Sequence, residues 1–159
     1  MIKMIIKRAE SEDMKEILSI QKKAYISEAK IYNDYTISPL VQTEDEIKEE
    51  FKNHVFLKAI TQNKIVGSVR APILNSKTCY IERLIVHPDF QNKGIGTQLM
   101  NKIEEIFSDC EKFELITGHN SKKNIYIYEK RGYEIFKTEK LTDNLNLVYL
   151  EKINNSGSL

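Results

Sequence analysis

Apolar residues recur at intervals of three and four along four stretches of the chain, and this spacing predicts four helices. Ser11 precedes the first stretch as a capping residue, and Thr43 with Glu46 forms a capping box before the second. Gly132 follows the fourth, where a left-handed glycine is expected to end the helix. Residues 27–42 lose the period, which predicts a loop. The predicted helices are residues 11–26, residues 43–53, a segment that begins near Gly94, and residues 121–131.

Seven shorter stretches rich in β-branched and aromatic residues predict strands. Pro88 ends the fourth, because proline has no amide hydrogen to donate to a ladder. Helices and strands are interspersed along the chain, so we predict a mixed α/β layer architecture. The predicted strands are residues 2–8, 54–61, 64–74, 78–86, 112–117, 133–137 and 146–152.

The length and the charge balance narrow the class of protein. A chain of 159 residues fits one domain, and we assign residues 1–153 to it and the small polar residues 154–159 to a flexible tail. Lys and Arg number 24 and Asp and Glu number 23, which gives a net charge of +1. We therefore expect no nucleic-acid partner, because nucleic-acid-binding domains usually carry a strong basic excess.

The expected localisation and metal content follow from the absence of long apolar runs and of metal-ligand spacings in the sequence. No apolar run approaches the roughly 20 residues that cross a bilayer, and no signal-peptide core is present, so we expect a cytoplasmic protein without a membrane partner. Cys79 and Cys110 lie far apart, which favours free thiols. His54, His87 and His119 show no metal-ligand spacing, so we expect no metal.

The segment from Leu84 to Thr97 carries the candidate chemistry. A strand leads into a turn that contains Gly94 and Gly96, and the turn opens a helix. The first turn of a helix has unpaired amide hydrogens and about half a positive charge, and glycine lets a phosphate approach the backbone. The sequence therefore predicts an anion site at residues 91–97, to which Lys93 adds a mobile cation.

The pattern of this turn separates it from two common phosphate-binding motifs. A P-loop needs GxxxxGK[ST], which is absent, and GxGxxG would need a third glycine after Gly96. What remains is Q-x-x-G-x-G after a strand that ends V-x-P. This resembles the central motif of the GNAT superfamily of N-acetyltransferases, whose turn binds the pyrophosphate of acetyl-coenzyme A (acetyl-CoA). The alternative is a tight turn without a ligand.

A second stretch strengthens the resemblance. Residues 124–133 resemble the second signature of the family, a helix that ends Y-x-x-x-G-[FY]. The likeness covers most of the chain and implies a GNAT-like fold, with a mixed, mostly antiparallel central sheet of about seven strands flanked by about four helices. It also implies that a homodimer is possible, since dimers are common in the family.

The resemblance assigns the donor site. The strand that contains Leu84 and Val86 is expected to splay from residues 112–117, so that its free backbone groups pair with pantetheine. The Val86 amide would face the thioester carbonyl and stabilise the oxyanion, an effect worth about 3–4 kcal/mol in a well-studied hydrolase. Asn124 stands where the family often has a small residue, and its amide could instead hydrogen-bond pantetheine. The expected acetyl-CoA-binding residues are Leu84, Ile85, Val86, Gln91, Asn92, Lys93, Gly94, Ile95, Gly96, Thr97, Asn120 and Asn124.

Two residues are candidates for proton transfer. Tyr128 resembles the family's general acid, which protonates the leaving thiolate; the alternative is a core tyrosine on an apolar helix face shared with Tyr126. Glu82 falls on the same strand face as Leu84 and Val86 by period two, and desolvation on that face would make it a usable base. Its alternatives are a salt bridge to Arg83 or a lysine, or an exposed edge position.

The function that the resemblance implies is transfer of an acetyl group from acetyl-CoA to a primary amine, by direct attack in a ternary complex. The alternative is a catalytically silent coenzyme A-binding sensor or regulatory module. The acceptor, a small-molecule or peptide amine, is not identified by any motif, and a longer acyl group stays open. The family usually recognises the acceptor in the region that corresponds to residues 27–42. There Glu28 and Asp34 could attract a cationic amine, between Tyr32 and Tyr35.

Overall fold

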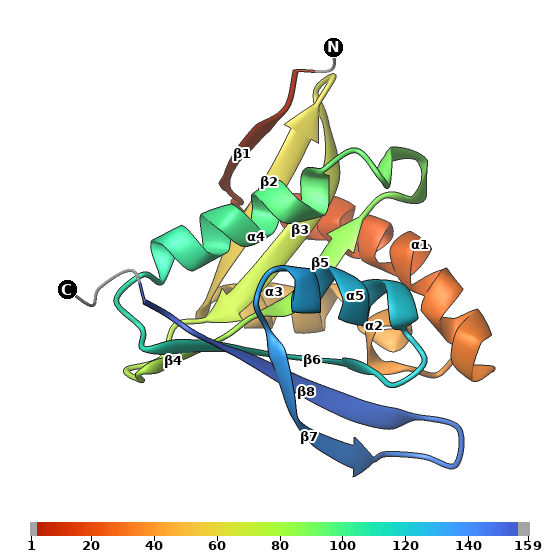
Figure 1. Cartoon of the computed structure of the whole chain (residues 1–159). Helices are drawn as coiled ribbons and strands as arrows, with labels where there is room; N and C mark the ends of the chain where they lie inside the picture. The colour runs from red at the N-terminus through yellow and green to blue at the C-terminus, as the bar shows by residue number, and fades with distance from the viewer. Residues whose placement is uncertain (1–2, 156–159) are drawn as a thin grey trace.

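The computed structural model describes residues 3–155 (Figure 1). Its strands are β1 (Ile5–Arg8), β2 (His54–Thr61), β3 (Lys64–Pro72), β4 (Thr78–Tyr80), β5 (Glu82–Val86), β6 (Lys112–Gly118), β7 (Glu134–Lys140) and β8 (Asn146–Ile153). Its α-helices are α1 (Met14–Tyr32), α2 (Ser38–Val41), α3 (Glu44–Phe51), α4 (Ile95–Ile106) and α5 (Lys122–Lys130), with 3-10 turns at Ser11–Asp13 and Pro88–Phe90. The strands form two four-stranded sheets, ordered β1-β2-β3-β5 and β4-β6-β8-β7.

The predicted α/β class with a mixed, mostly antiparallel arrangement is confirmed. β4 and β6 run parallel, and the other paired strands of the described residues are antiparallel. The described part has eight strands where the sequence predicts seven, because the predicted strand 78–86 is divided at Ile81. Before Ile81 the chain pairs with β6, and after it the chain pairs with β3.

The prediction that the first helix ends near residue 26 and that a loop fills residues 27–42 is wrong. Helix α1 continues to Tyr32, and residues 38–41 form the short helix α2. Tertiary packing extends α1, because Ala29 is fully buried and Tyr32 is 4% exposed. Asn33 then ends the helix with a left-handed φ of 49°.

Several local signals fold as the sequence predicts. Thr43 and Glu46 form the reciprocal capping box of α3. Gly132 follows α5 with a φ of 98°. Ser121 stands at the N-cap of α5, but its hydroxyl makes no capping bond and instead bonds to α1.

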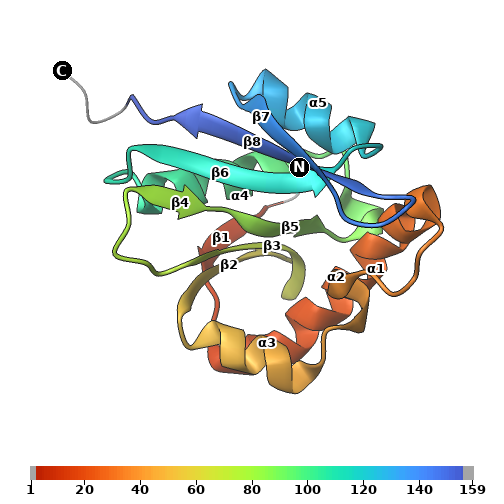
Figure 2. The ribbon, with the colours of Figure 1, turned by 90° about the horizontal axis from the view of Figure 1, so that it is seen from below.

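The helices sandwich the first sheet. Helix α4 lies on one face, and α1 and α3 lie on the other, as Figures 1 and 2 show. Leu99, Met100 and Ile103 of α4 pack in a cluster with β2 and β3, and Ile17 and Ile47 pack on the opposite side with Phe56. The site is therefore built on a sheet that is fixed from both faces.

Two predictions extend beyond the described residues: the start of the first strand and the C-terminal tail. The predicted first strand begins at residue 2, and most of the predicted tail is residues 156–159, all of which lie outside the described residues. The division into a domain and a flexible tail stays a prediction. None of the helices in residues 3–155 has the length and apolar character needed to cross a membrane.

Candidate active site

The two sheets separate after Ile81. The Ile81 amide donates to the Glu114 carbonyl at 2.8 Å, but from Glu82 onward β5 pairs only with β3 among the described strands. A cavity of about 940 Å³ lies where β5 and β6 diverge, with α1, α2, α5 and the β7–β8 loop as its other walls. The expected splay of residues 84–86 from residues 112–117 is therefore confirmed.

The free edge of β5 faces away from β3. The His87 amide donates to the Val66 carbonyl at 2.8 Å, so it points toward β3. Because successive residues of a strand present their backbone groups to opposite edges, the Val86 amide points to the other edge, where β6 has separated. The side chain of Gln91 already uses that edge, since its Nε2 donates to the Val86 carbonyl at 3.3 Å. The strand thus has a free backbone edge, as the resemblance implies for a strand that pairs with pantetheine.

The turn after β5 has the geometry predicted for an anion site. Gly94 is the N-cap of α4 with a left-handed φ of 83°, and Asn92 has a φ of 62°. No side chain of the described residues caps this helix, and residues 91–94 are exposed. A Cβ added to Gly94 would meet no protein atom within 4 Å, so the space beside it is open. The first amides of α4 therefore face open space at the surface.

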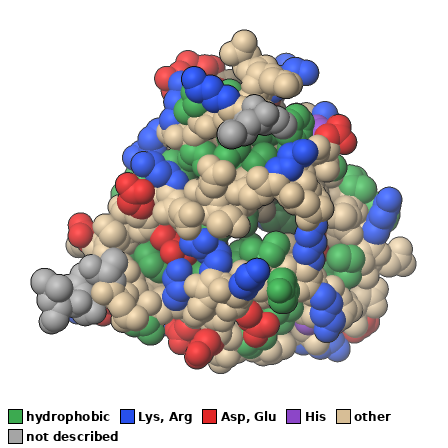
Figure 3. Space-filling model, turned by 45° about the horizontal axis from the view of Figure 1, so that its top comes forward, with side chains coloured by type: hydrophobic (Ala, Val, Ile, Leu, Met, Phe, Trp, Pro, Cys, Tyr) green, Lys and Arg blue, Asp and Glu red, His purple; other side chains and the backbone are tan. Residues whose placement is uncertain are grey.

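On the face drawn in Figure 3 the surface is hollowed near its centre. Hydrophobic side chains lie inside the hollow, and Lys and Arg side chains lie on its rim. Such a surface combines an apolar interior with cations at the edge, which suits a ligand that has an apolar arm and an anionic end.

Tyr128 of α5 forms part of the cavity wall and is only 8% exposed. Burial, followed by the nearby Tyr25 and Glu28, raises the pKa of its phenol well above the ordinary value. A phenol is protonated at neutral pH even without this shift, so Tyr128 has a proton to donate, and the shift makes it a weaker acid than an ordinary tyrosine. The reading that Tyr126 shares a buried helix face with it is wrong, because Tyr126 is 64% exposed.

Glu82 lies on a different face of β5 from the one expected. Between Ser68 and Arg70 of β3 the register with β5 shifts, and Arg83 has a left-handed φ of 51°. This bulge breaks the period of two, so the prediction that Glu82 shares a face with Leu84 and Val86 is wrong. Its side chain is also 43% exposed, so the expected desolvation is absent. Glu82 nevertheless lines the cavity.

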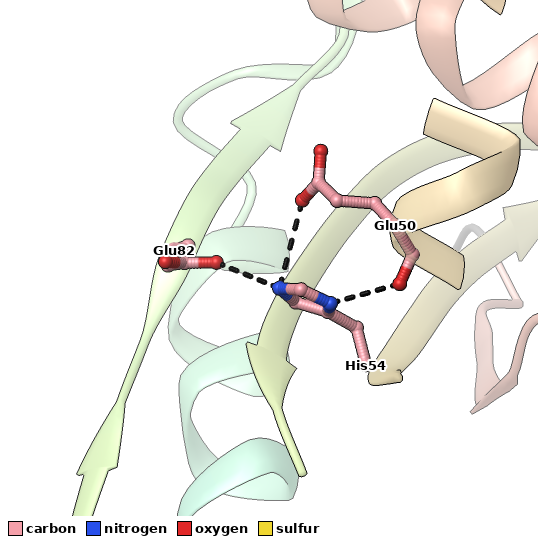
Figure 4. Close-up of side chains that lie close together, drawn as sticks. All are labelled: Glu50, His54 and Glu82. Atoms are coloured by element: carbon pink, nitrogen blue, oxygen red, sulfur yellow. Dashed lines mark hydrogen bonds and ion pairs between the residues drawn. The ribbon is translucent and has the colours of Figure 1, made fainter. Parts of the chain in front are cut away.

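A histidine that the sequence did not assign to the site holds Glu82 in place (Figure 4). His54 Nε2 lies 3.2 Å from Glu82 Oε1 and 3.7 Å from Glu50 Oε2, and His54 Nδ1 lies 2.8 Å from the Glu50 carbonyl oxygen. Burial lowers the pKa of His54, but Glu82 and Glu50 outweigh it and the net shift is upward. The four-residue spacing of Glu50 and His54 is the local sequence signal for this contact. Glu82 comes close to His54 because β2 and β5 both pair with β3.

The same three side chains bring potential metal ligands together, since one ligand atom from each lies within 4.8 Å of the others. One observation opposes a metal here. Arg70 donates to both carboxylate oxygens of Glu50, so that carboxylate already has a cationic partner. The group is better described as an ion-pair network that orients Glu82.

Hydrogen bonds between α1 and the start of α5 form another wall of the cavity. The Glu28 carboxylate accepts from the Ser121 hydroxyl at 2.6 Å and from Asn124 Nδ2 at 2.9 Å. The side chain of Asn124 therefore bonds to α1 here, although it also lines the cavity. Asn120 is exposed, and its backbone amide donates to the Tyr32 hydroxyl at 3.0 Å.

The structure brings some of the predicted residues to the cavity and leaves others elsewhere. Leu84 and Asn124 line it, and Ile85 is 2% exposed in the core beneath the strand. Of the acceptor candidates in α1 and the segment after it, Glu28, Tyr32 and Asp34 line the cavity. Tyr35 is 52% exposed and lies outside this lining.

Comparison with known proteins agrees with this geometry. Residues 8–133 match the model of the acetyltransferase (GNAT) family. The chain superposes on the PaiA N-acetyltransferase of Thermoplasma acidophilum in complex with coenzyme A with a TM-score of 0.80 at 18% identity, covering 95% of this chain and 99% of the other. The ribosomal-protein-S18-alanine N-acetyltransferase of Escherichia coli gives 0.79 at 14% identity, covering 99% of each chain. These structural likenesses show the fold.

Curated relatives match this chain over only part of their own length. The UPF0157 protein YqkA of Bacillus subtilis is 29% identical over 143 residues, which cover 89% of this chain and 40% of YqkA. An acetyltransferase of Pectobacterium atrosepticum is 35% identical over 83 residues, which cover 50% of this chain and 57% of that protein. The chain thus spans about half the length of these relatives or less. The family match covers most of this chain, which therefore belongs to the GNAT family of acetyltransferases.

Proposed function

We propose that this protein transfers an acetyl group from acetyl-CoA to a primary amine by direct attack in a ternary complex. The observation that supports this function best is that three features adjoin one another: the start of α4, the free edge of β5 and the cavity. The uncapped start of α4 leads along the free edge of β5 to a cavity that holds Tyr128 and Glu82. The family match supports acetyl transfer in general, and the roles of individual residues are part of the proposal.

The donor would lie along β5. Amides at the start of α4 would bind its pyrophosphate, with Lys93 beside them, and the free edge at Leu84 and Val86 would pair with pantetheine. The Val86 amide would then donate to the thioester carbonyl oxygen, where negative charge develops as the amine attacks. Helix N-termini and strand edges need no change of backbone to make these contacts.

The proton transfers would use groups on the cavity wall. The acceptor arrives as an ammonium, and Glu82 or a water relay would take the proton that frees its lone pair for attack on the thioester carbon. The C–S bond breaks, the thiolate leaves, and the phenol of Tyr128 would give it a proton. The nitrogen loses its second proton as the amide forms, which allows the phenolate to be reprotonated. His54 would act as a positioning residue that fixes the Glu82 carboxylate.

The test combines binding and turnover. Acetyl-CoA binding is measured by calorimetry, and release of free thiol is measured with a panel of primary amines. Binding with amine-dependent thiol release supports the transferase. Binding without thiol release for any amine favours the sensor module, and no binding at all contradicts both.

Two left-handed glycines provide a matched comparison for the donor site. Gly94→Ala and Gly132→Ala place an alanine at similar positive φ values, so both carry a similar backbone strain of about 1–2 kcal/mol. Only Gly94→Ala adds a methyl group where the phosphates would approach. We expect the Kd for acetyl-CoA to rise at least about 10-fold in Gly94→Ala, through lost amide contacts, and to be unchanged in Gly132→Ala. Equal affinities in the two variants would contradict the assignment of the anion site.

Other expectations stay predictions: a cytoplasmic location, no nucleic-acid or membrane partner, no metal, and a homodimer as the possible assembly.

A further inference from the structure

Arg83 is an arginine in the cavity without an acidic partner. The chain has four arginines. Arg70 pairs with Glu50 at 3.1 Å and Arg131 pairs with Glu104 at 3.2 Å, whereas Arg8 is exposed on β1. Arg83 is half-buried and lines the cavity, yet no carboxylate in residues 3–155 forms an ion pair with it. Partly buried cations normally have a counter-charge, because removing them from water is costly.

Neutral hydroxyl groups hold the Arg83 guanidinium. Its Nη2 donates to the Ser38 hydroxyl of α2 at 2.8 Å, and the guanidinium lies close enough to the Tyr25 phenol of α1 to oppose the rise in its pKa that burial causes. A guanidinium has five N–H donors in a planar fork, so these two contacts leave donors available. Glu50 on the neighbouring helix does not serve it, because Arg70 already occupies that carboxylate and repels Arg83.

The backbone accounts for the position of this side chain. Arg83 occupies the bulge of β5 with a φ of 51°, a conformation that an L-residue adopts at an energetic cost. Bulges re-aim the side chain of a strand residue, and this one directs Arg83 toward α1 and α2. The guanidinium therefore belongs to the acceptor side of the cavity and not to the anion site at the start of α4.

Charges of both signs thus line one cavity. Glu28 accepts hydrogen bonds from the neutral Ser121 and Asn124, and Glu82 lies beside Arg83 in the chain. Carboxylates suit the ammonium group of an acceptor, and the open fork of Arg83 suits a carboxylate, which it can bind through two parallel hydrogen bonds.

We propose that Arg83 binds a carboxylate of the acceptor, so that the acceptor is an amino acid or a related amine that also carries a carboxylate. This inference rests on the proposed acetyl transfer, because it takes the cavity as the acceptor site. A simple polyamine would leave Arg83 unpaired beside its own positive charges, and it is the principal competing substrate class.

Matched acceptors test the proposal. Each L-amino acid is compared with the amine obtained by removing its carboxylate, such as phenylalanine with phenethylamine, leucine with isoamylamine, and lysine with cadaverine. We expect at least one pair in which the amino acid has a kcat/KM about 10- to 100-fold higher, the usual range for a hydrogen bond to a charged group. Pairs in which the decarboxylated amines are equal or better would overturn the proposal.

Variants locate the effect at Arg83. In Arg83→Gln the KM for the preferred amino acid should rise about 10- to 100-fold, with little change for its decarboxylated partner and an unchanged Kd for acetyl-CoA. Arg83→Lys should restore part of the affinity, because it keeps the charge but loses the planar fork. Arg8→Gln removes the same charge from the exposed strand β1 and should leave the KM unchanged. Equal losses for both members of a pair in Arg83→Gln would contradict the carboxylate role.

A binding experiment separates this proposal from the proposed function. N-acetyl-L-amino acids, which are the products expected, are titrated by calorimetry into the protein saturated with coenzyme A. Binding that is weakened in Arg83→Gln supports the proposal even without turnover. If coenzyme A binds but no N-acetyl-amino acid binds and no amino acid is acetylated, only the carboxylate inference fails. If coenzyme A itself does not bind, the transferase assignment fails.

Discussion

The hydroxyl groups of Tyr32 and Ser121 lie 2.7 Å apart and join the end of α1 to the start of α5. The same Tyr32 hydroxyl accepts the Asn120 amide, and the Ser121 hydroxyl donates to Glu28. Tyr32 is only 4% exposed, and its ring lies directly over Gly118 at the end of β6. One wall of the cavity therefore depends on a tyrosine that needs a glycine beneath it.

Gly118→Ala should destabilise the protein. A Cβ at this position would overlap the hydroxyl and ring of Tyr32, which is buried and hydrogen-bonded and so has little freedom to move. Overpacking of this kind typically costs about 1–3 kcal/mol, and displacing Tyr32 would also break its bonds to α5. The free energy of unfolding, measured with urea, should fall by about that amount.

Gly96→Ala is the matched control for Gly118→Ala. A Cβ at Gly96 would lie 3.8 Å from side-chain atoms of Leu84 and Val86, which is ordinary van der Waals contact. Its free energy of unfolding should therefore not fall, and should rise by up to about 1 kcal/mol because alanine is favoured over glycine in a helix. Equal stability of the two variants would show that Tyr32 does not occupy the space above Gly118.

The behaviour of α1 shows what the sequence can and cannot predict about this fold. Signals that act within a few residues were sufficient for the capping box at Thr43 and the left-handed Gly132. The extension of α1 to Tyr32 depends on contacts with Gly118 and Ser121, some 90 positions away. Polar residues in that stretch obscure the helical period, and only tertiary packing makes the helix continue.

Tyr128→Phe should slow turnover without weakening acetyl-CoA binding. The protonated phenol lies in the cavity wall, where it would serve as the acid for the leaving thiolate, and general acids contribute about 10²–10⁴-fold. We expect kcat to fall at least about 100-fold, with an unchanged calorimetric Kd for acetyl-CoA. Tyr126→Phe, on an exposed position of the same helix, is the control and should retain full activity. Unchanged turnover in Tyr128→Phe would remove this residue from the mechanism.

The sequence predicted only part of the candidate site. The strand, turn and helix around Gly94 are contiguous, so their spacing alone predicted the geometry that is observed. Glu82 was identified as a cavity residue, but its face was wrong, because one left-handed residue at Arg83 shifts the strand period. His54 reaches Glu82 across 28 positions through the pairing of β2, β3 and β5, and no local pattern reports such a contact.

His54 should make the stability of the protein depend on pH. Its pKa is raised in the folded state, because Glu82 and Glu50 outweigh the effect of burial. A raised histidine pKa stabilises the fold fully below the unfolded-state pKa of about 6.5, and this contribution disappears as the pH rises through the higher folded-state pKa. The loss of unfolding free energy in His54→Gln should therefore be larger at about pH 5.5 than at about pH 9.

The partner of His54 provides the control for this pH effect. Glu82→Gln removes the largest favourable contribution to the imidazolium, so in that background the difference between the two pH values should shrink. An NMR titration of the His54 ring measures the same quantity directly and should show a lower midpoint in Glu82→Gln. A larger effect of His54→Gln at high pH than at low pH would mean that burial dominates and that the ion pair is not formed.

Glycine should be more stable than alanine at position 83. In the interior of a strand glycine is usually worse than alanine by about 0.5–1 kcal/mol, because it loses more conformational freedom on folding. At Arg83 the φ of 51° reverses that order, since a left-handed conformation costs an L-residue about 1–2 kcal/mol and costs glycine little. Arg83→Gly should therefore unfold at higher urea concentration than Arg83→Ala, and Thr138→Gly should unfold at lower concentration than Thr138→Ala on the exposed strand β7. If glycine and alanine had the same order of stability at both positions, the backbone at Arg83 would not be strained. The predicted reversal would mean that the protein keeps an arginine where glycine is conformationally preferred, as expected if the guanidinium is retained for binding.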